Sequence, residues 1–223
     1  MLKMPIDRSF PQAFTLIELL VVIAIIGILV TLLLPSLSRT KQSSGAIVCK
    51  SQLHQVGIGM ELYANDNNDL YPESGNQIFW GAIDSHTKLH SWMELAIPYT
   101  VNTNVYKCPN DKESNFSYFN GARAAYVDSG SVAPVNRKRV LFSTAFVLSG
   151  DTIWGGKANA EDADKDDFTA NCVGGPLNGV PALGWRRHNG SQNLLFVDGH
   201  VKAYETYVPA EMTFRYDSIH SWR

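Results

Sequence analysis

The chain has 223 residues, of which 45% are hydrophobic, 11% aromatic and 18% charged, and its formal net charge is −2. This composition excludes global disorder, gives no sign of a broadly basic nucleic-acid-binding surface, and holds too few cysteines (three) for a disulfide-dense scaffold. The mean hydropathy of −0.11 is that of an ordinary soluble domain, so the position of the hydrophobic residues along the chain carries the information.

The first predicted element is a membrane-spanning helix. Residues 19–34 read LLVVIAIIGILVTLLL without a charge, and extension back to Phe14 adds one acid, Glu18. As a helix, Phe14 to Leu34 is about 31 Å long at ~1.5 Å per residue, which matches the ~30 Å hydrocarbon core of a bilayer. An acid inside such a span is costly, so Glu18 is a candidate functional residue.

The charges before this segment predict its orientation. Lys3 and Arg8 precede the span and favour a cytoplasmic N-terminus by the positive-inside rule, which places the bulk of the chain outside. An ordinary cleaved secretory signal would have a shorter apolar region followed by a small-residue cleavage site. Here the apolar run is longer and ends in Pro35-Ser36-Leu37-Ser38, which fits such a site poorly.

The sequence AFTLIE at residues 13–18, followed by the apolar run, resembles the N-terminus of type IV prepilins and type II secretion pseudopilins. The resemblance implies a 13-residue leader, cleavage between Ala13 and Phe14 by prepilin peptidase, and N-methylation of Phe14. It also implies that Glu18 pairs with the N-terminus of a neighbouring subunit during assembly. Ala13 stands where the family normally has glycine.

The resemblance also implies partners and a location. The partners are prepilin peptidase, other pilin-like subunits, an inner-membrane assembly platform and membrane lipid; nothing indicates nucleic acid. The chain is expected to be a single-pass inner-membrane protein with a periplasmic or extracytoplasmic head. The interpretation is a non-enzymatic subunit of a type II secretion or type IV pilus-like fibre. The alternative is a membrane-anchored binding or surface protein that uses the prepilin signal for export and anchoring, and a tethered enzyme is a third class.

The predicted fold is α+β and pilin-like, with a membrane helix at 14–35, an amphipathic continuation at 36–66 and an extracytoplasmic head at 67–223. Asn65 to Asp69 and Pro72 should end the long helix. Its continuation is expected to pack an apolar stripe on the head, formed by Val48, Leu53, Val56, Met60 and Tyr63.

Shorter elements are predicted within the head. Residues 76–83 and 91–99 carry Trp80 and Trp92 and should anchor a short helix or strands. Residues 139–151 alternate as a strand, and 155–184 are expected to form a long surface loop. The side chains on one face of that strand would be Val140, Phe142, Thr144, Phe146 and Leu148.

A C-terminal hairpin is predicted at 193–204, because Asp198-Gly199 separates two β-rich runs. A two-residue turn there places Phe196 opposite Val201, and Leu194 opposite Ala203, with these four facing the helix. The other, mixed face would then hold Val197 opposite His200, and Leu195 opposite Lys202.

His188, nine residues and Asp198-Gly199 resemble the C-terminal motif of a large group of prepilin-like proteins. Three further segments agree with that group: Cys49 with Leu53 and Gln55, Tyr63-Ala64-Asn65-Asp66, and Cys108-Pro109-Asn110-Asp111. His188 and Asp198 could form a catalytic or metal pair, or serve the hairpin structurally. The structural role is favoured, because no activated nucleophile accompanies them.

The cysteines leave two interpretations open. In an oxidising compartment Cys49 and Cys108 would form a disulfide, which stabilises by roughly 2–4 kcal/mol; otherwise they are two buried free thiols. Cys172 then has no assigned partner.

The acidic run at 161–167 does not form a calcium-binding EF-hand loop. Asp162, Asp164 and Asp166 match its first, third and fifth positions, but Asp167 replaces the glycine at position six and Val173 replaces the final glutamate. A different calcium loop, such as major pseudopilins often hold, stays open without a complete motif. No metal ligand set is predicted.

Overall fold

The computed structural model describes residues 15–73, 91–100, 102–112, 116–121, 133–151, 188, 190–205, 208 and 210–219. Several predictions concern residues outside these ranges: the leader and cleavage site with Ala13 and Phe14, the segment around Trp80, the 155–184 loop with its acidic run, and Cys172.

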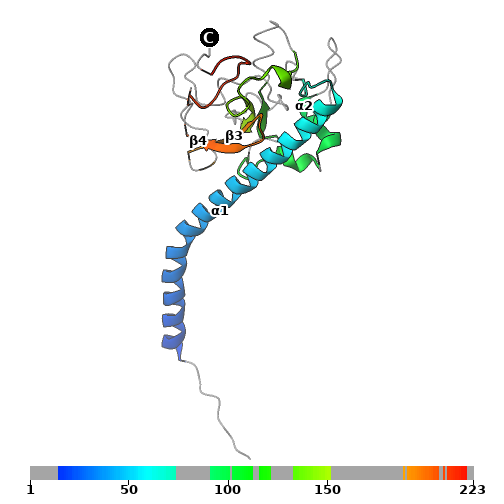
Figure 1. Cartoon of the computed structure of the whole chain (residues 1–223). Helices are drawn as coiled ribbons and strands as arrows, with labels where there is room; N and C mark the ends of the chain where they lie inside the picture. Colours follow the sequence, from blue (N-terminus) through cyan, green and yellow to red (C-terminus); the bar gives the residue numbers. More distant parts are fainter. Residues whose placement is uncertain are drawn as a thin grey trace, which may run out of the picture. The chain divides into compact units, whose positions relative to one another are not determined.

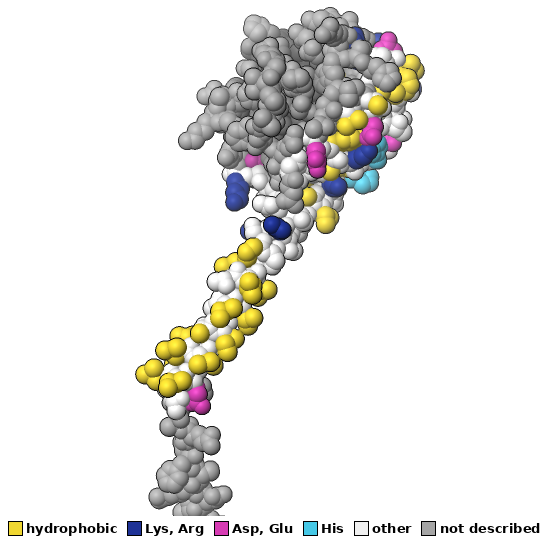
Figure 2. All heavy atoms as spheres, turned by 90° about the vertical axis from the view of Figure 1, so that its left-hand side faces the viewer, with side chains coloured by type: hydrophobic (Ala, Val, Ile, Leu, Met, Phe, Trp, Pro, Cys, Tyr) yellow, Lys and Arg dark blue, Asp and Glu magenta, His cyan; other side chains and the backbone are white. Residues whose placement is uncertain are grey.

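Helix α1 (Leu16–Asp66) is the first element, and its apolar N-terminal part belongs to a unit of its own, residues 1–41. Leucine, isoleucine and valine side chains from Leu16 to Leu34 are exposed all along this part of the helix. Figure 2 shows hydrophobic side chains covering the face turned to the viewer. Among the described residues, α1 is the one helix long and apolar enough to cross a membrane. A surface of this kind is unfavourable in water and suits lipid or other apolar helices.

The second half of α1 packs on the head, residues 42–223. The predicted stripe is confirmed at its centre but not at its ends: Val48 is 43% exposed and Tyr63 only half-buried. Five residues turn a helix by about 140° beyond one full turn, so Val48 cannot share a face with Leu53. The stripe that the structure buries is Cys49, Leu53, Val56, Met60 and Ala64.

Helix α1 ends as the sequence predicts. Asn68 and Asp69 follow it with φ values of 56° and 63°, in the left-handed region that asparagine and aspartate tolerate. Arg137 then binds both Asp69 and Glu61, at 2.8 Å from Nε to Oδ1 and 2.9 Å from Nη1 to Oε2. These ion pairs hold the end of the helix against the segment that precedes Val147, in the second half of the chain.

A four-stranded antiparallel sheet forms the head in the order β1 (Tyr118–Asn120), β2 (Val147–Asp151), β3 (Gln192–Phe196) and β4 (Val201–Tyr204). Figure 1 shows β3 and β4 beside the C-terminal half of α1. Leu148 and Leu195 join the core against the helix, whereas Leu194 and Phe196 face a second cluster with Met212 and Phe214. The architecture is α+β and pilin-like, as predicted.

Three short helical elements lie between α1 and β1: α2 (Trp92–Ala96), η1 (Ile97–Tyr99) and η2 (Thr103–Tyr106). A further one, η3 (Arg137–Arg139), lies between β1 and β2. Of the two predicted alternatives around Trp92, a short helix or strands, the structure has the helix. It starts with a capping box, because the Ser91 hydroxyl accepts from the Glu94 amide and the Glu94 carboxylate accepts from the Ser91 amide. Trp92 is fully buried and meets Tyr106 edge to face.

The strand predicted at 139–151 begins late, at Val147. The segment before it is a turn in which the amides of Ala145 and Phe146 both donate to the carbonyl of Phe142. Local hydrogen bonds of this kind compete with strand pairing. The prediction that Val140, Phe142 and Thr144 share a strand face with Leu148 is therefore wrong.

The hairpin is present, but its predicted register is wrong by one residue on β4. Leu195 lies opposite Val201, and Leu194 opposite Lys202. The loop has three residues, Val197 to Gly199, and it is closed by the Gly199 amide donating to the Phe196 carbonyl at 2.9 Å. This arrangement, a turn followed by a glycine with positive φ, is the next most common hairpin loop after the two-residue form.

The predicted faces of β3 are also wrong. Leu195, expected on the mixed face, packs against Gly57 of α1, where an added Cβ would lie 3.0 Å from Leu195 Cδ1. Leu194 and Phe196, expected against the helix, lie on the opposite side of the sheet. The prediction assumed one covered face, whereas the C-terminal segment around Met212 and Phe214 covers the second.

Replacing Gly199 by alanine is expected to destabilise the head by about 1–2 kcal/mol, the cost of placing a Cβ in the left-handed region. Gly199 has φ +88° and open space around it, so backbone conformation is the source of the cost. Gly27→Ala is the matched control, since Gly27 has open space and an ordinary φ. Equal unfolding midpoints for the two variants in denaturant would contradict the three-residue loop.

Candidate functional site

The first candidate site is the N-terminal end of α1. The Glu18 carboxylate accepts hydrogen bonds from the Thr15 amide at 2.8 Å and from the Thr15 hydroxyl at 2.7 Å, and the Thr15 hydroxyl accepts from the Glu18 amide at 3.3 Å. This is a reciprocal capping box, which supplies partners to otherwise free amides at a helix start. Glu18 therefore has a local role at the helix start, and its carboxylate is exposed to a further partner.

The C-terminal motif does not form a catalytic or metal pair. The Asp198 carboxylate, at the hairpin tip, accepts from the His200 amide at 3.1 Å and lies 2.6 Å from His200 Nδ1. His188 instead pairs with Asp151, at 3.2 Å from Nε2 to Oδ2. The less favoured alternative, a His188–Asp198 pair, is absent from the structure, because Asp198 lies at the exposed hairpin tip and His188 is buried.

His188 is tied to the start of the hairpin, as the structural interpretation expected. Its backbone exchanges two hydrogen bonds with Ser191, and the Ser191 hydroxyl donates to the His188 carbonyl at 2.8 Å. The ring thereby becomes a fixed donor or acceptor inside the head.

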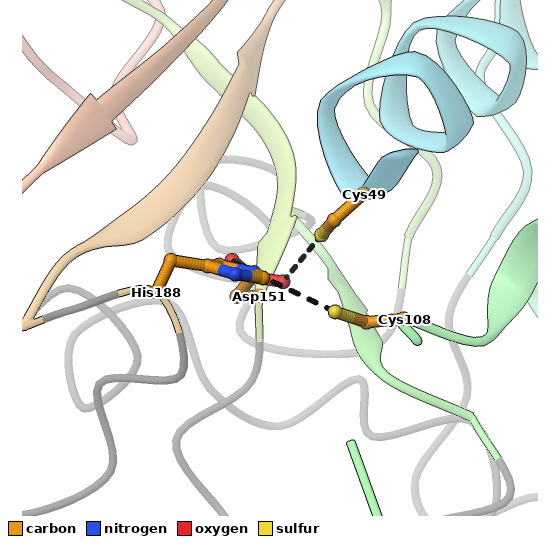
Figure 3. A group of neighbouring side chains, drawn as sticks. All are labelled: Cys49, Cys108, Asp151 and His188. Carbon is orange, nitrogen blue, oxygen red and sulfur yellow. Dashed lines mark hydrogen bonds and ion pairs between the residues drawn. The ribbon is translucent and has the colours of Figure 1, made fainter. Parts of the chain in front are cut away.

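Around that ring, four side chains from four segments meet, and we call them the Cys–His–Asp cluster. Cys49 comes from α1, Cys108 follows η2, Asp151 ends β2, and His188 precedes β3 (Figure 3). Their ligand atoms all lie within 4.8 Å of one another. The Cys49 thiol donates to Asp151 Oδ1 at 3.1 Å, and Cys108 Sγ lies 3.5 Å from His188 Nε2.

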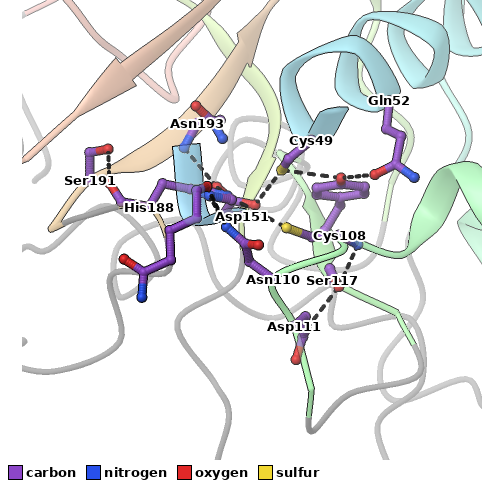
Figure 4. Close-up of polar contacts among 12 residues, drawn as sticks. Cys49, Gln52, Cys108, Asn110, Asp111, Ser117, Asp151, His188, Ser191 and Asn193 are labelled. Atoms are coloured by element: carbon purple, nitrogen blue, oxygen red, sulfur yellow. Dashed lines mark hydrogen bonds and ion pairs between the residues drawn. The ribbon is translucent and has the colours of Figure 1, made fainter. Parts of the chain in front are cut away.

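Polar neighbours surround the cluster (Figure 4). The backbone amide of Asn193 donates to Asp151 Oδ2 at 2.8 Å, and the Tyr118 hydroxyl lies 3.2 Å from Cys49 Sγ. Asn110 Nδ2 lies 3.1 Å from His188 Nδ1. All four members are buried, with Cys108 fully buried and His188 only 4% exposed.

This environment shifts the pKa values of the two thiols in opposite directions. The hydrogen bond from Cys49 lowers the pKa of Cys108 to about 6, against the opposing effect of burial. Burial raises the pKa of Cys49, and the bond to Cys108 raises it further. Burial alone would lower the pKa of His188, but its bonds to Asp151 and Cys108 raise it to about 9.

Cys49 and Cys108 are both free thiols in the structure. The sequence analysis correctly predicted that Cys49 and Cys108 lie close together. Of the two interpretations, a disulfide or buried free thiols, the structure has the free thiols. The disulfide stays a prediction for the protein under oxidising conditions.

The cluster has the chemistry of a thiolate–imidazolium pair and of a metal ligand set. A nucleophilic thiol has to reach a substrate, and the complete burial of Cys108 prevents this in the structure. Two sulfurs, an imidazole and a carboxylate are, by contrast, a donor set that metal sites use without solvent access.

Sequence reasoning missed Asp151 as a site residue. Cys49, Cys108 and His188 all stood in recognised motif segments, but no spacing linked them to the last residue of a β-rich run. The available signal was the RVLFSTAFVLSGD segment itself, in which an acid ends a predicted alternating strand.

Two comparisons with known proteins each match a part of the chain. A family model described as the prokaryotic N-terminal methylation motif matches residues 9–34. The chain is 42% identical over 57 residues to the type IV wide pilus major component PilA4 of Thermus thermophilus. This match covers 26% of the chain and 44% of the relative, so the chain matches less than half of that relative's length.

No solved structure matches the chain significantly. The motif and the similarity to a pilin agree with the exposed apolar half of α1 and with the sheet that packs on its other half. On these grounds the chain resembles type IV prepilins.

Proposed function

We propose that the chain, after cleavage between Ala13 and Phe14 and N-methylation of Phe14, is a subunit of a type IV pilus-like or type II secretion fibre. The observation that carries the proposal is the methylation motif at residues 9–34, joined to a helix exposed and apolar on every side. Prepilin peptidase would process it, and an inner-membrane platform would assemble it with other pilin-like subunits. Lipid would surround the helix before assembly, and neighbouring helices would surround it afterwards.

The energetic argument rests on the exposed apolar surface. From Leu16 to Leu34 the large apolar side chains are between 44% and 78% exposed. Burial of such surface stabilises by roughly 25 cal/mol per Å² in water, so these helices cannot be left in water during transfer from the membrane. A fibre core replaces lipid contacts with helix contacts, which differ mainly through packing and polar pairs.

Glu18 supplies the polar pair in this proposal. The α-amino group created by cleavage before Phe14 would lie on a neighbouring subunit, and a carboxylate removed from water is tolerated only with such a partner. The exposure of the capped carboxylate in the structure supports this role.

The intact mass of the protein isolated from membranes tests the processing step. We expect a mass that corresponds to loss of residues 1–13 and gain of one methyl group. An uncut chain, or a chain cut after Ser38, would contradict the proposal.

Ala13→Gly refines the same test. Glycine restores the residue that the resembled family has before the cut, so the processed fraction should rise in a pulse-chase experiment. Ala13→Val is the control, because a branched side chain at this position should slow cleavage. Equal processing of all three chains would show that cleavage does not occur at this bond.

A second candidate function is that of a membrane-anchored extracytoplasmic binding or surface protein that uses the prepilin signal for export and anchoring alone. The family model covers only residues 9–34, and the head carries a buried Cys–His–Asp cluster of its own, which favours a separate role for the head. Crosslinking through a pair of cysteines introduced at both Leu20 and Leu29 of each chain separates the two candidates. A fibre subunit gives ladders of crosslinked chains, whereas an isolated anchor stays monomeric.

A further inference from the structure

The Cys–His–Asp cluster belongs to the unit of residues 42–223, whereas the proposed fibre role uses the apolar N-terminal half of α1 and leaves the cluster unexplained. Four ligand-type side chains are buried together in the core of the head, where each is costly without partners. They come from positions separated by at least 37 residues in sequence, so the fold itself, and not a local turn, gathers them.

We propose that Cys49, Cys108, Asp151 and His188 bind one zinc ion, which ties α1 to the sheet as a structural site. The donor set suits this ion, because zinc takes thiolate, imidazole and carboxylate ligands in four-coordinate sites. Four protein ligands leave no open position, and the site is buried, both of which are features of structural zinc sites.

The distances between donor atoms fit a tetrahedral ion. Zinc bonds of about 2.0–2.3 Å at tetrahedral angles place neighbouring donor atoms about 3.3–3.8 Å apart. In the structure, Cys49 Sγ lies 3.1 Å from Asp151 Oδ1, and His188 Nε2 lies 3.2 Å from Asp151 Oδ2 and 3.5 Å from Cys108 Sγ. The two Asp151 contacts use different carboxylate oxygens, of which one would bind the ion, and they are 0.1–0.2 Å shorter than this range. The outer limit of 4.8 Å for the whole set requires an inward movement of about 1 Å at most.

The surrounding groups fit the charge of the bound state. Zinc binding displaces the thiol protons to solvent, and Zn²⁺ with two thiolates and one carboxylate has a net charge of −1. The hydroxyl of Tyr118 lies 3.2 Å from Cys49 Sγ, and the Asn193 amide donates to Asp151. Donors of this kind stabilise ligands that carry excess negative charge.

The Asn110 amide fits the histidine ligand after one rotation. With zinc on His188 Nε2, the ring proton lies on Nδ1 and needs an acceptor. Asn110 contacts Nδ1 at 3.1 Å through its amide nitrogen, which also donates to the Gln42 carbonyl at 3.0 Å. Rotation of that amide by half a turn presents its oxygen to Nδ1 and gives up the bond to Gln42.

Zinc content of the full chain, purified in detergent without chelators, tests the proposal. We expect about one zinc ion per chain, and loss of most of it in Cys108→Ser and in His188→Ala. His200→Ala is the matched control, since His200 is exposed and pairs with Asp198 outside the cluster, and it should keep the ion. Metal-free wild-type protein, or zinc retained in both cluster variants, would overturn the proposal.

Cobalt substitution keeps the test decisive where a variant fails to fold. Wild-type protein depleted with a chelator and reloaded with Co²⁺ should show the intense visible bands of a tetrahedral site and a near-ultraviolet thiolate charge-transfer band. Chelation should lower the Tm of the head by about 10 °C, and zinc should restore it. Octahedral cobalt spectra without charge transfer, or an unchanged Tm, would contradict a structural zinc site.

Thiol reactivity under denaturing conditions separates zinc from the predicted disulfide. In a Cys172→Ser background, two thiols should react slowly before chelation and at once after it. Two thiols that react only after a reductant would show the disulfide and overturn the proposal. Two thiols equally reactive with and without chelator would also overturn it.

Discussion

Glu18→Ala is expected to leave membrane insertion intact and to reduce fibre assembly more than about 100-fold. The reduction follows from the proposed function, in which the Glu18 carboxylate pairs with the amino terminus of a neighbouring subunit. Removal of one member of a buried ion pair costs about 3–5 kcal/mol, because the other charge is left without a partner. Insertion should be unaffected, since replacement of an acid by alanine makes the apolar segment easier to insert. Sheared fibre fractions, quantified by immunoblot against membrane-retained protein, measure the effect.

The capping box supplies the control that separates charge from helix capping. Glu18→Gln keeps a side chain that can accept from the Thr15 amide, but it removes the charge, so it should fail in assembly like Glu18→Ala. Thr15→Ala weakens the cap by about 1 kcal/mol and keeps the charge, so it should still assemble. Normal assembly of Glu18→Gln would show that the carboxylate serves only the helix start.

Leu195→Ala is expected to destabilise the head by about 2–5 kcal/mol, the usual cost of such a truncation in a packed core. Leu195 is fully buried and lies against Gly57 of α1. The hairpin register predicted from the sequence places it instead on the mixed face, where the change would cost about 0.5 kcal/mol or less. Denaturant unfolding of the full chain in detergent, followed by tryptophan fluorescence, measures the difference.

Leu141→Ala is the matched control for Leu195→Ala. Leu141 is the same residue type at 69% exposure, so its truncation should change the free energy of unfolding by about 0.5 kcal/mol or less. Equal effects of the two substitutions would favour the predicted register over the one in the structure.

The elements that could be predicted were those with strong local signals. The apolar run at 19–34 and the AFTLIE segment indicated the membrane helix and the prepilin-like class, because lipid compatibility depends on composition along one continuous segment. The Asn-rich end of α1 and the Asp198-Gly199 turn were predictable for a similar reason, since local backbone preferences act over a few residues. The register across that turn was not, because two- and three-residue loops use the same residue types.

Tertiary contacts decided which residues of α1 are buried and which residues form the Cys–His–Asp cluster. Cys49 is buried on the helix stripe where Val48 was predicted. The reason is that all stripe residues have to face the same sheet, and Val48 points to another side of the helix. Asp151 could not be linked to His188 from the sequence, since neither its spacing nor its neighbours distinguish it from an acid that ends any strand.

The sequence by itself determined the class of the protein and its relation to a membrane, because an uncharged helix of that length and an acid at its start are properties of one segment. The tertiary structure alone decided that His188 meets Asp151 and two thiols instead of Asp198. Those contacts join four segments through the packing of α1 on the sheet, and packing of this kind depends on the three-dimensional surface of the whole head.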